Sequence, residues 1–199
     1  MSELEIADWR RRVQAIYATV RDAVTPQAGF DAWHAARDDL FLSHPQSPLM
    51  GDDALRRSGL PYFRYDPALR FAVQLDPESD GPVHEVHSAN DGTIAMRRIG
   101  HVTLAAPVSA TLDVWWLAQY GGGIFLPLRD GTSGHETYGG GRYLLDTAKG
   151  ADLSTSRDGL VLDLNFLYHP SCRYNPAWEC PLAPAGNTID APIRAGERL

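Results

Sequence analysis

A change of hydrophobic period near residue 60 constrains the fold of this 199-residue chain more than any other feature. Before it, apolar side chains recur at three- and four-residue steps, which is the period of an amphipathic helix. From Tyr62 onward, apolar and polar residues alternate, and turn signals rather than helices separate the runs. We therefore predict an α+β fold, with N-terminal helices packed on an antiparallel β-barrel-like or sandwich sheet and an irregular, proline-rich C-terminal tail.

Two helices are predicted before residue 60. Pro26 stops the first helix or lies just past its end, and the second ends before His44-Pro45, because the residue before a proline disfavours helix. A short helical turn is expected near residues 52–57. The apolar stripes of the two helices are Ile6, Trp9, Val13, Ile16, Tyr17, Val20 and Val24, and then Phe30, Trp33, Leu40 and Phe41.

Nine strands are predicted after the change of period, with Asn90-Asp91-Gly92 as the best hairpin signal. We expect a single domain over residues 1–199, with a helical arm over 1–60, an antiparallel sheet over 61–167 and a wrapping tail over 168–199. The predicted strands are Tyr62–Tyr65, Leu69–Leu75, Val83–His87, Thr93–Arg98, His101–Ala105, Ser109–Leu117, Gly123–Leu128, Arg142–Leu145 and Leu160–Phe166.

Two of these strands place unusual residues on one face, because strand side chains alternate. In Leu160–Phe166 the apolar face must enter the core, so Asp163 and Asn165 project together to solvent or into a polar cavity. In Ser109–Leu117, Trp115 falls on the otherwise polar face. A tryptophan there suits a docked helix or a ligand cavity better than open solvent.

Composition excludes several classes of function. The net charge of −7 argues against a nucleic-acid partner, because binding to phosphates requires a basic surface. No apolar run reaches the length of a membrane span, and the first residues do not resemble a signal peptide, so no membrane partner is expected and the cytoplasm is the expected compartment. The sequence indicates neither a cofactor nor an oligomeric state.

The densest polar segment is Arg129–Tyr143, where glycines allow tight turns and close approach of other groups. One interpretation is a structured loop in which polar side chains cap the backbone and Arg142 pairs with an acid. The other is a small-molecule pocket with Arg142 as an anion anchor and Asp163 as a general base. The candidate ligand-binding residues are Asp130, Thr132, Glu136, Thr137, Tyr138, Arg142, Asp163, Asn165 and Tyr168.

The two cysteines do not predict a metal site. Cys172 and Cys180 are eight residues apart, and the spacing typical of zinc ligands is missing. Small packing residues and a local bridge are both compatible with the pattern.

Several motifs resemble the family catalogued as domain of unknown function 1684. They are Phe125-Leu-Pro-Leu-Arg-Asp-Gly-Thr, Glu136-Thr-Tyr-Gly, Gly141-Arg-Tyr, Asp163-Leu-Asn165, Tyr168-His-Pro-Ser-Cys172, Cys180-Pro-Leu, Asn187 and Ala195-Gly-Glu197, together with Trp33, Arg37-Asp38 and Ser47-Pro48-Leu49 near the start. The chain departs from the usual Asn and Pro of this family at His169 and Ser171.

The resemblance implies no specific activity, so two hypotheses remain. Either the motifs form a small-molecule pocket with the tail, or they lock the tail to the sheet and function lies in an interaction with another protein.

Overall fold

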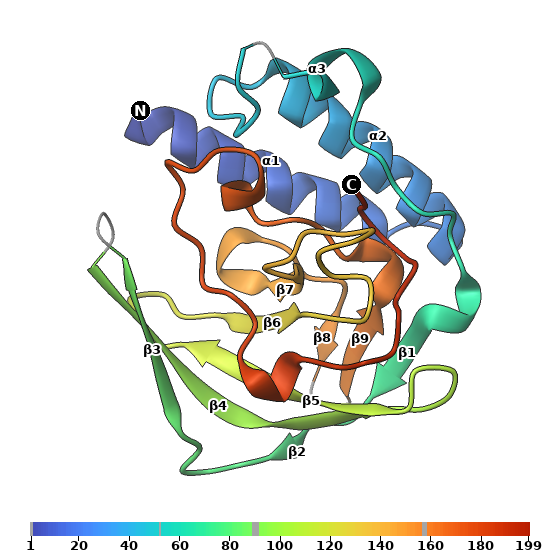
Figure 1. Cartoon of the computed structure of the whole chain (residues 1–199), viewed down its shortest axis with the longest axis vertical. Helices are drawn as coiled ribbons and strands as arrows, with labels where there is room; N and C mark the ends of the chain where they lie inside the picture. The colour runs from blue at the N-terminus through green and yellow to red at the C-terminus, as the bar shows by residue number, and fades with distance from the viewer. Residues whose placement is uncertain (1, 52, 89–91, 157–158) are drawn as a thin grey trace.

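The computed structural model describes residues 2–51, 53–88, 92–156 and 159–199, and it shows helices packed on antiparallel sheets. Figure 1 shows the two long helices side by side at one end of the molecule and the larger sheet at the other. The predicted α+β class with N-terminal helices is confirmed. The strands are β1 (Arg70–Val73), β2 (Asp76–Pro77), β3 (Val83–Ser88), β4 (Gly92–Leu104), β5 (Ala110–Leu117), β6 (Ile124–Leu128), β7 (Arg142–Asp146), β8 (Thr155–Ser156) and β9 (Gly159–Asp163).

Both long helices begin at side-chain caps. Helix α1 (Glu3–Arg21) starts at a capping box between Ser2 and Glu5, in which each residue satisfies a free backbone N–H group. Thr25 accepts a hydrogen bond from the Ala28 N–H group at the start of α2 (Pro26–Ser43). Pro26 therefore lies past the end of α1 and also opens α2, a position where its missing N–H group costs nothing.

Shorter helical segments connect the other elements. Helix α3 (Leu55–Ser58) corresponds to the turn predicted near residues 52–57, of which residue 52 lies outside the described residues. The 3₁₀ turns are η1 (Pro67–Leu69), η2 (Thr147–Lys149), η3 (Leu164–Phe166), η4 (Ser171–Arg173) and η5 (Ala185–Asn187).

The strands form two antiparallel sheets and, within the described residues, no closed barrel. The larger sheet has the order β2-β4-β5-β6-β7, with β3 also paired to β4, and the smaller has the order β1-β9-β8. The long strand β4 spans two strands that were predicted separately, because a bulge between Arg98 and Gly100 lets one strand continue through the irregularity. Two-residue strands such as β2 and β8 carry too little alternation to be predicted from sequence.

Two predicted strands are corrected. Tyr62–Tyr65 is not a strand, since only Tyr62 forms an isolated bridge, with Glu197. The last predicted strand ends at Asp163 and not at Phe166, because the Asp163 side chain accepts a hydrogen bond from the Asn165 N–H group and starts the turn η3. Of the predicted hairpin turn, Asn90 and Asp91 lie outside the described residues, whereas Gly92 pairs with Ser88 across β3 and β4.

One hydrophobic core joins the helices to both sheets. Trp33 of α2 is its largest buried side chain and packs against Phe166 of η3, with ring centroids 5.2 Å apart. Leu144 of β7 and Leu162 of β9 belong to the same core, so each sheet shares apolar side chains with the helices. Within the described residues, no helix is both long enough and apolar enough to cross a bilayer.

The C-terminal tail covers the polar face of β5. The indole N–H group of Trp115 donates a 2.7 Å hydrogen bond to the side chain of Asn187, which donates in turn to the backbone carbonyl of Asp113. Asn187 belongs to η5 and is fully buried. Trp115 therefore packs beneath the tail, and the 3₁₀ turn η5 covers it, whereas the sequence suggested a docked helix or a ligand cavity.

Candidate functional site

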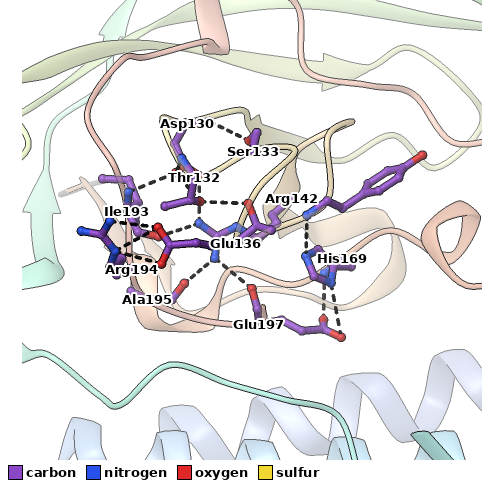
Figure 2. Close-up of polar contacts among 12 residues, drawn as sticks. Asp130, Thr132, Ser133, Glu136, Arg142, His169, Ile193, Arg194, Ala195 and Glu197 are labelled. Carbon is purple, nitrogen blue, oxygen red and sulfur yellow. Dashed lines mark hydrogen bonds and ion pairs between the residues drawn. The ribbon is translucent and has the colours of Figure 1, made fainter. Parts of the chain in front are cut away.

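Arg142 lies at the start of β7 and is inaccessible to solvent. It donates to the carbonyl oxygens of Ala195, Glu197 (3.0 Å) and Ile193 (2.8 Å) in the tail, and to the Asp130 carboxylate (2.8 Å). Figure 2 shows its guanidinium group between the 129–141 loop and the tail. A guanidinium has five N–H donors, and only Nε of Arg142 lacks a partner among the described residues. We call this set of contacts the Arg142 lock.

Asp130 is the acidic partner in the Arg142 lock. Besides Arg142, its carboxylate accepts hydrogen bonds from the Ile193 N–H group (3.0 Å) and from both the N–H group and the hydroxyl of Thr132. The Thr132 hydroxyl lies 2.9 Å from the hydroxyl of Thr137. These side chains are buried, and their polar atoms form hydrogen bonds with one another, as the structured-loop interpretation of the segment predicts.

Two glycines let the tail approach the scaffold closely. A Cβ atom at Gly131 would lie 2.3 Å from the carbonyl oxygen of Asp190, which is too close for any side chain. Gly196 has φ +71°, and a Cβ atom there would lie 2.3 Å from the carbonyl oxygen of Leu167. Only glycine satisfies both the close contact and the left-handed conformation at residue 196.

A second buried ion pair lies beside the Arg142 lock. Glu197 is inaccessible and accepts a 3.0 Å hydrogen bond from Arg37 of α2, whose guanidinium lies over the rings of Phe41 (4.3 Å) and Tyr168 (4.9 Å). Burial raises the pKa of Glu197, and the Arg37 charge opposes that rise. Glu197 also accepts a hydrogen bond from the His169 N–H group (2.8 Å), so one carboxylate connects the tail to α2 and to the segment after β9.

Two further candidates border the Arg142 lock without belonging to it. Glu136 forms an exposed ion pair with Arg194, with the nearest atoms 2.9 Å apart. Tyr138 donates its backbone N–H group to Nε2 of His169 (3.1 Å), and its hydroxyl lies 4.0 Å from the Cys172 sulfur.

Asp163 and Asn165 lie in a separate polar network. Asp163 is bonded to the side chain of Asn165 (2.7 Å), to Tyr65 (3.3 Å) and to Arg70 (3.4 Å), and Asn165 also bonds both backbone groups of Asp66. Burial raises the pKa of Asp163. We expected one cluster containing Arg142 and Asp163, but the hydrogen bonds of the described residues form two groups, and the acid that pairs with Arg142 is Asp130.

A cavity of about 90 Å³ lies between the helices and β7. Three residues of its lining each carry a buried polar atom with no hydrogen-bond partner among the described residues: Tyr17 (Oη), Arg37 (Nε) and Asp146 (Oδ1). Tyr168 is the sequence-predicted candidate that lines this cavity, together with His169. We refer to it as the inner cavity.

A larger cleft of about 630 Å³ adjoins the inner cavity. The two hollows share the lining residues Trp9, Lys149, Ser171 and Cys180, and Trp178 adds a second indole ring to the outer cleft. Lys149 lies 3.3 Å from Asp146 Oδ2 and is more than half exposed, which places a cation where the two hollows meet.

Sequence reasoning missed most residues of the inner cavity. Tyr17 belongs to the apolar stripe of α1 and Asp146 closes an apolar strand, so each resembled an ordinary member of its element. In the sequence, Arg37 of the cavity and its partner Glu197 stand out only as parts of family motifs. The detectable signal was the spacing of Trp9, Val13 and Tyr17 on one helix face, which indicates a buried face but not a hollow beneath it.

Comparison with known proteins identifies the family. A model of the family described as a protein of unknown function (DUF1684) matches residues 57–198, and the chain belongs to this family, as its motifs predicted. The chain is also similar to the solution NMR structure of an uncharacterized protein of Haloarcula marismortui, with 28% sequence identity and a TM-score of 0.62. That match covers 85% of this chain and 91% of the other. A search of curated proteins found no relative.

The first prediction concerns the Arg142 lock. Arg142→Ala should lower the free energy of unfolding by about 3–5 kcal/mol, because it leaves the buried Asp130 carboxylate and three tail carbonyls without their donor. Urea denaturation measures this change. Arg194→Ala is the matched control, since it removes an exposed arginine from the same loop–tail boundary and should leave the midpoint nearly unchanged. Equal effects of the two substitutions would refute the lock.

The second prediction concerns acid stability. Burial, with smaller contributions from the charges of Arg142, Arg173 and Arg37, lowers the pKa of His169 to about 2. The native protein therefore binds fewer protons at this site than the unfolded chain between pH 2 and the ordinary histidine pKa of about 6.5. Stability should fall as the pH is lowered through this window, by up to about 1.4 kcal/mol per pH unit.

His169→Asn removes this titration and keeps the Glu197 carboxyl, so its stability curve should be flatter below pH 6. Chemical denaturation of both proteins between pH 7 and pH 4 provides the measurement. Parallel curves for the two proteins would show that His169 binds protons equally in the native and unfolded states, which would contradict the lowered pKa.

Proposed function

We propose that this protein binds a small organic molecule through the inner cavity and the outer cleft. The observation that supports the proposal is that three residues lining one hollow, Tyr17, Arg37 and Asp146, each carry a buried polar atom without a hydrogen bond among the described residues. Each such group costs about 1–3 kcal/mol when it is buried without a hydrogen bond. Three of them at one place are typical of a site whose partners come from a ligand or from ordered water.

The donors and acceptors of the inner cavity define the head group that it takes. Arg37 Nε donates, a carboxylate oxygen of Asp146 accepts, and the Tyr17 hydroxyl can do either. Because Arg37 is neutralised by Glu197 and Asp146 lies beside Lys149, the cavity has no strong net charge. A neutral group that both donates and accepts, such as an alcohol or a carboxamide, fits this arrangement better than a charged one.

The inner cavity has room for the head group of the ligand but not for its body. At about 90 Å³ it is smaller than the apolar cavity of about 150 Å³ that holds a benzene molecule. The body therefore lies in the outer cleft, where Trp9 and Trp178 offer aromatic surfaces.

The Arg142 lock serves this site indirectly. We propose that Asp130, Thr132, Thr137 and Arg142 hold the tail rather than bind a ligand, because their polar atoms are largely occupied by one another and by the tail backbone. The lock places Glu197 against Arg37, which orients one polar group of the cavity. The original pocket hypothesis thus moves from the loop to the space beneath the helices, with Tyr168 as its common residue.

Thermal melting with matched probes tests the binding proposal. Benzyl alcohol and benzamide share one aromatic body and carry the two expected head groups, whereas toluene has the body alone. A ligand that binds only the native state raises the melting temperature with concentration. We expect benzyl alcohol and benzamide to raise it and toluene to leave it nearly unchanged. No response to either polar probe, or an equal response to toluene, would contradict the proposal.

A single hydroxyl provides the site-specific control. Without ligand, Tyr17→Phe should be as stable as the wild type or more stable, because it removes a buried hydroxyl that has no protein partner. Its response to the polar probes should fall several-fold. Tyr120→Phe removes a fully exposed hydroxyl and should respond as the wild type does.

A further inference from the structure

The two cysteines, which are eight residues apart in the sequence, lie together in the structure. Both are free thiols that are partly accessible to solvent. Both border a surface groove of about 230 Å³ that also includes Tyr138 and Leu182. Cys180 additionally lines the inner cavity and the outer cleft, so this residue borders three hollows.

The surroundings of the pair distinguish the two sulfurs. Interaction with the Cys172 thiol, with a smaller contribution from the Lys149 ammonium, lowers the pKa of Cys180. Interaction with Cys180, together with burial, raises the pKa of Cys172. Cys180 is therefore the sulfur of the pair that ionises more readily.

We propose that Cys172 and Cys180 form a redox-active dithiol that exchanges with low-molecular-weight disulfides, with Cys180 as the attacking sulfur and Cys172 as the resolving one. This role is independent of ligand binding in the inner cavity. A half-buried thiol pair that lines a groove meets the two requirements of such exchange, which are access for the disulfide and a second thiol within reach.

The reaction proceeds in two balanced steps. The Cys180 thiolate attacks one sulfur of the disulfide RS–SR, which forms a mixed disulfide on Cys180 and releases RS⁻. Neutralising Cys180 removes the neighbouring negative charge, so Cys172 can lose its proton to RS⁻. The Cys172 sulfur then attacks the sulfur of Cys180 and displaces the second RS⁻, which takes a proton from solvent. The protein is oxidised to a Cys172–Cys180 disulfide, and RS–SR is reduced to two thiols.

Bis(2-hydroxyethyl) disulfide is a suitable neutral probe. The reduced wild-type protein should release two molecules of 2-mercaptoethanol per chain and end with an internal disulfide and no adduct, as measured by mass spectrometry. Because Cys180 ionises more readily than an ordinary thiol, the rate should level off at a lower pH than the ordinary cysteine pKa of about 8.5. A rate that continues to rise tenfold per pH unit up to pH 8 would contradict the assignment of the attacking thiolate.

Matched single substitutions separate the two sulfurs. Cys172→Ser should react once and keep a stable mixed disulfide on Cys180, whereas Cys180→Ser should react roughly tenfold more slowly at pH 7 because little of Cys172 is ionised. Circular dichroism checks that each variant is folded, and Cys172→Ala replaces the serine variant if that one is not. A stable mixed disulfide on the wild type, or equal rates for the two variants, would overturn the proposal.

Discussion

The buried guanidinium of Arg142 is the interaction on which the rest of the structure depends. It connects the Asp130 carboxylate to three carbonyl groups of a tail that has no regular secondary structure of its own at that point. Lysine offers three donors on a flexible stem and cannot reproduce this planar fork. With the tail held, Glu197 reaches Arg37 on α2, and the helices become tied to the sheet through charge as well as through apolar packing.

Two buried ion pairs lie side by side, and their charges balance. Arg142 with Asp130 and Arg37 with Glu197 supply equal numbers of opposite charges, so each of these four buried groups has an oppositely charged partner. Such pairs contribute little net stability compared with apolar packing, but breaking one is costly. We infer that they fix the path of the tail.

Much of the fold could be predicted from the period of the sequence, whereas the partners across the fold could not. Alternation located most strands and placed Trp115 on the polar face of its strand, but it did not predict that the turn η5 of the tail covers this side chain. Alternation could not distinguish Asp130 from Asp163 as the partner of Arg142, because the choice depends on sheet register and on the path of the tail. Tyr17 was hidden for the opposite reason, since a cavity wall and a packed core require the same apolar spacing on a helix.

Native-state hydrogen exchange tests most directly whether the tail is an integral part of the fold. The Ile193 N–H group is bonded to Asp130, and the Glu197 N–H group to the Leu167 carbonyl, whereas the amides of the β4–β5 ladder report on the larger sheet. If the Arg142 lock holds, the Ile193 and Glu197 amides should exchange with the same free energy of global unfolding as the ladder, because the tail cannot open while the sheet stays folded. Exchange of Ile193 and Glu197 at a much lower free energy than the β4–β5 ladder would show that the tail opens independently, and would contradict the account.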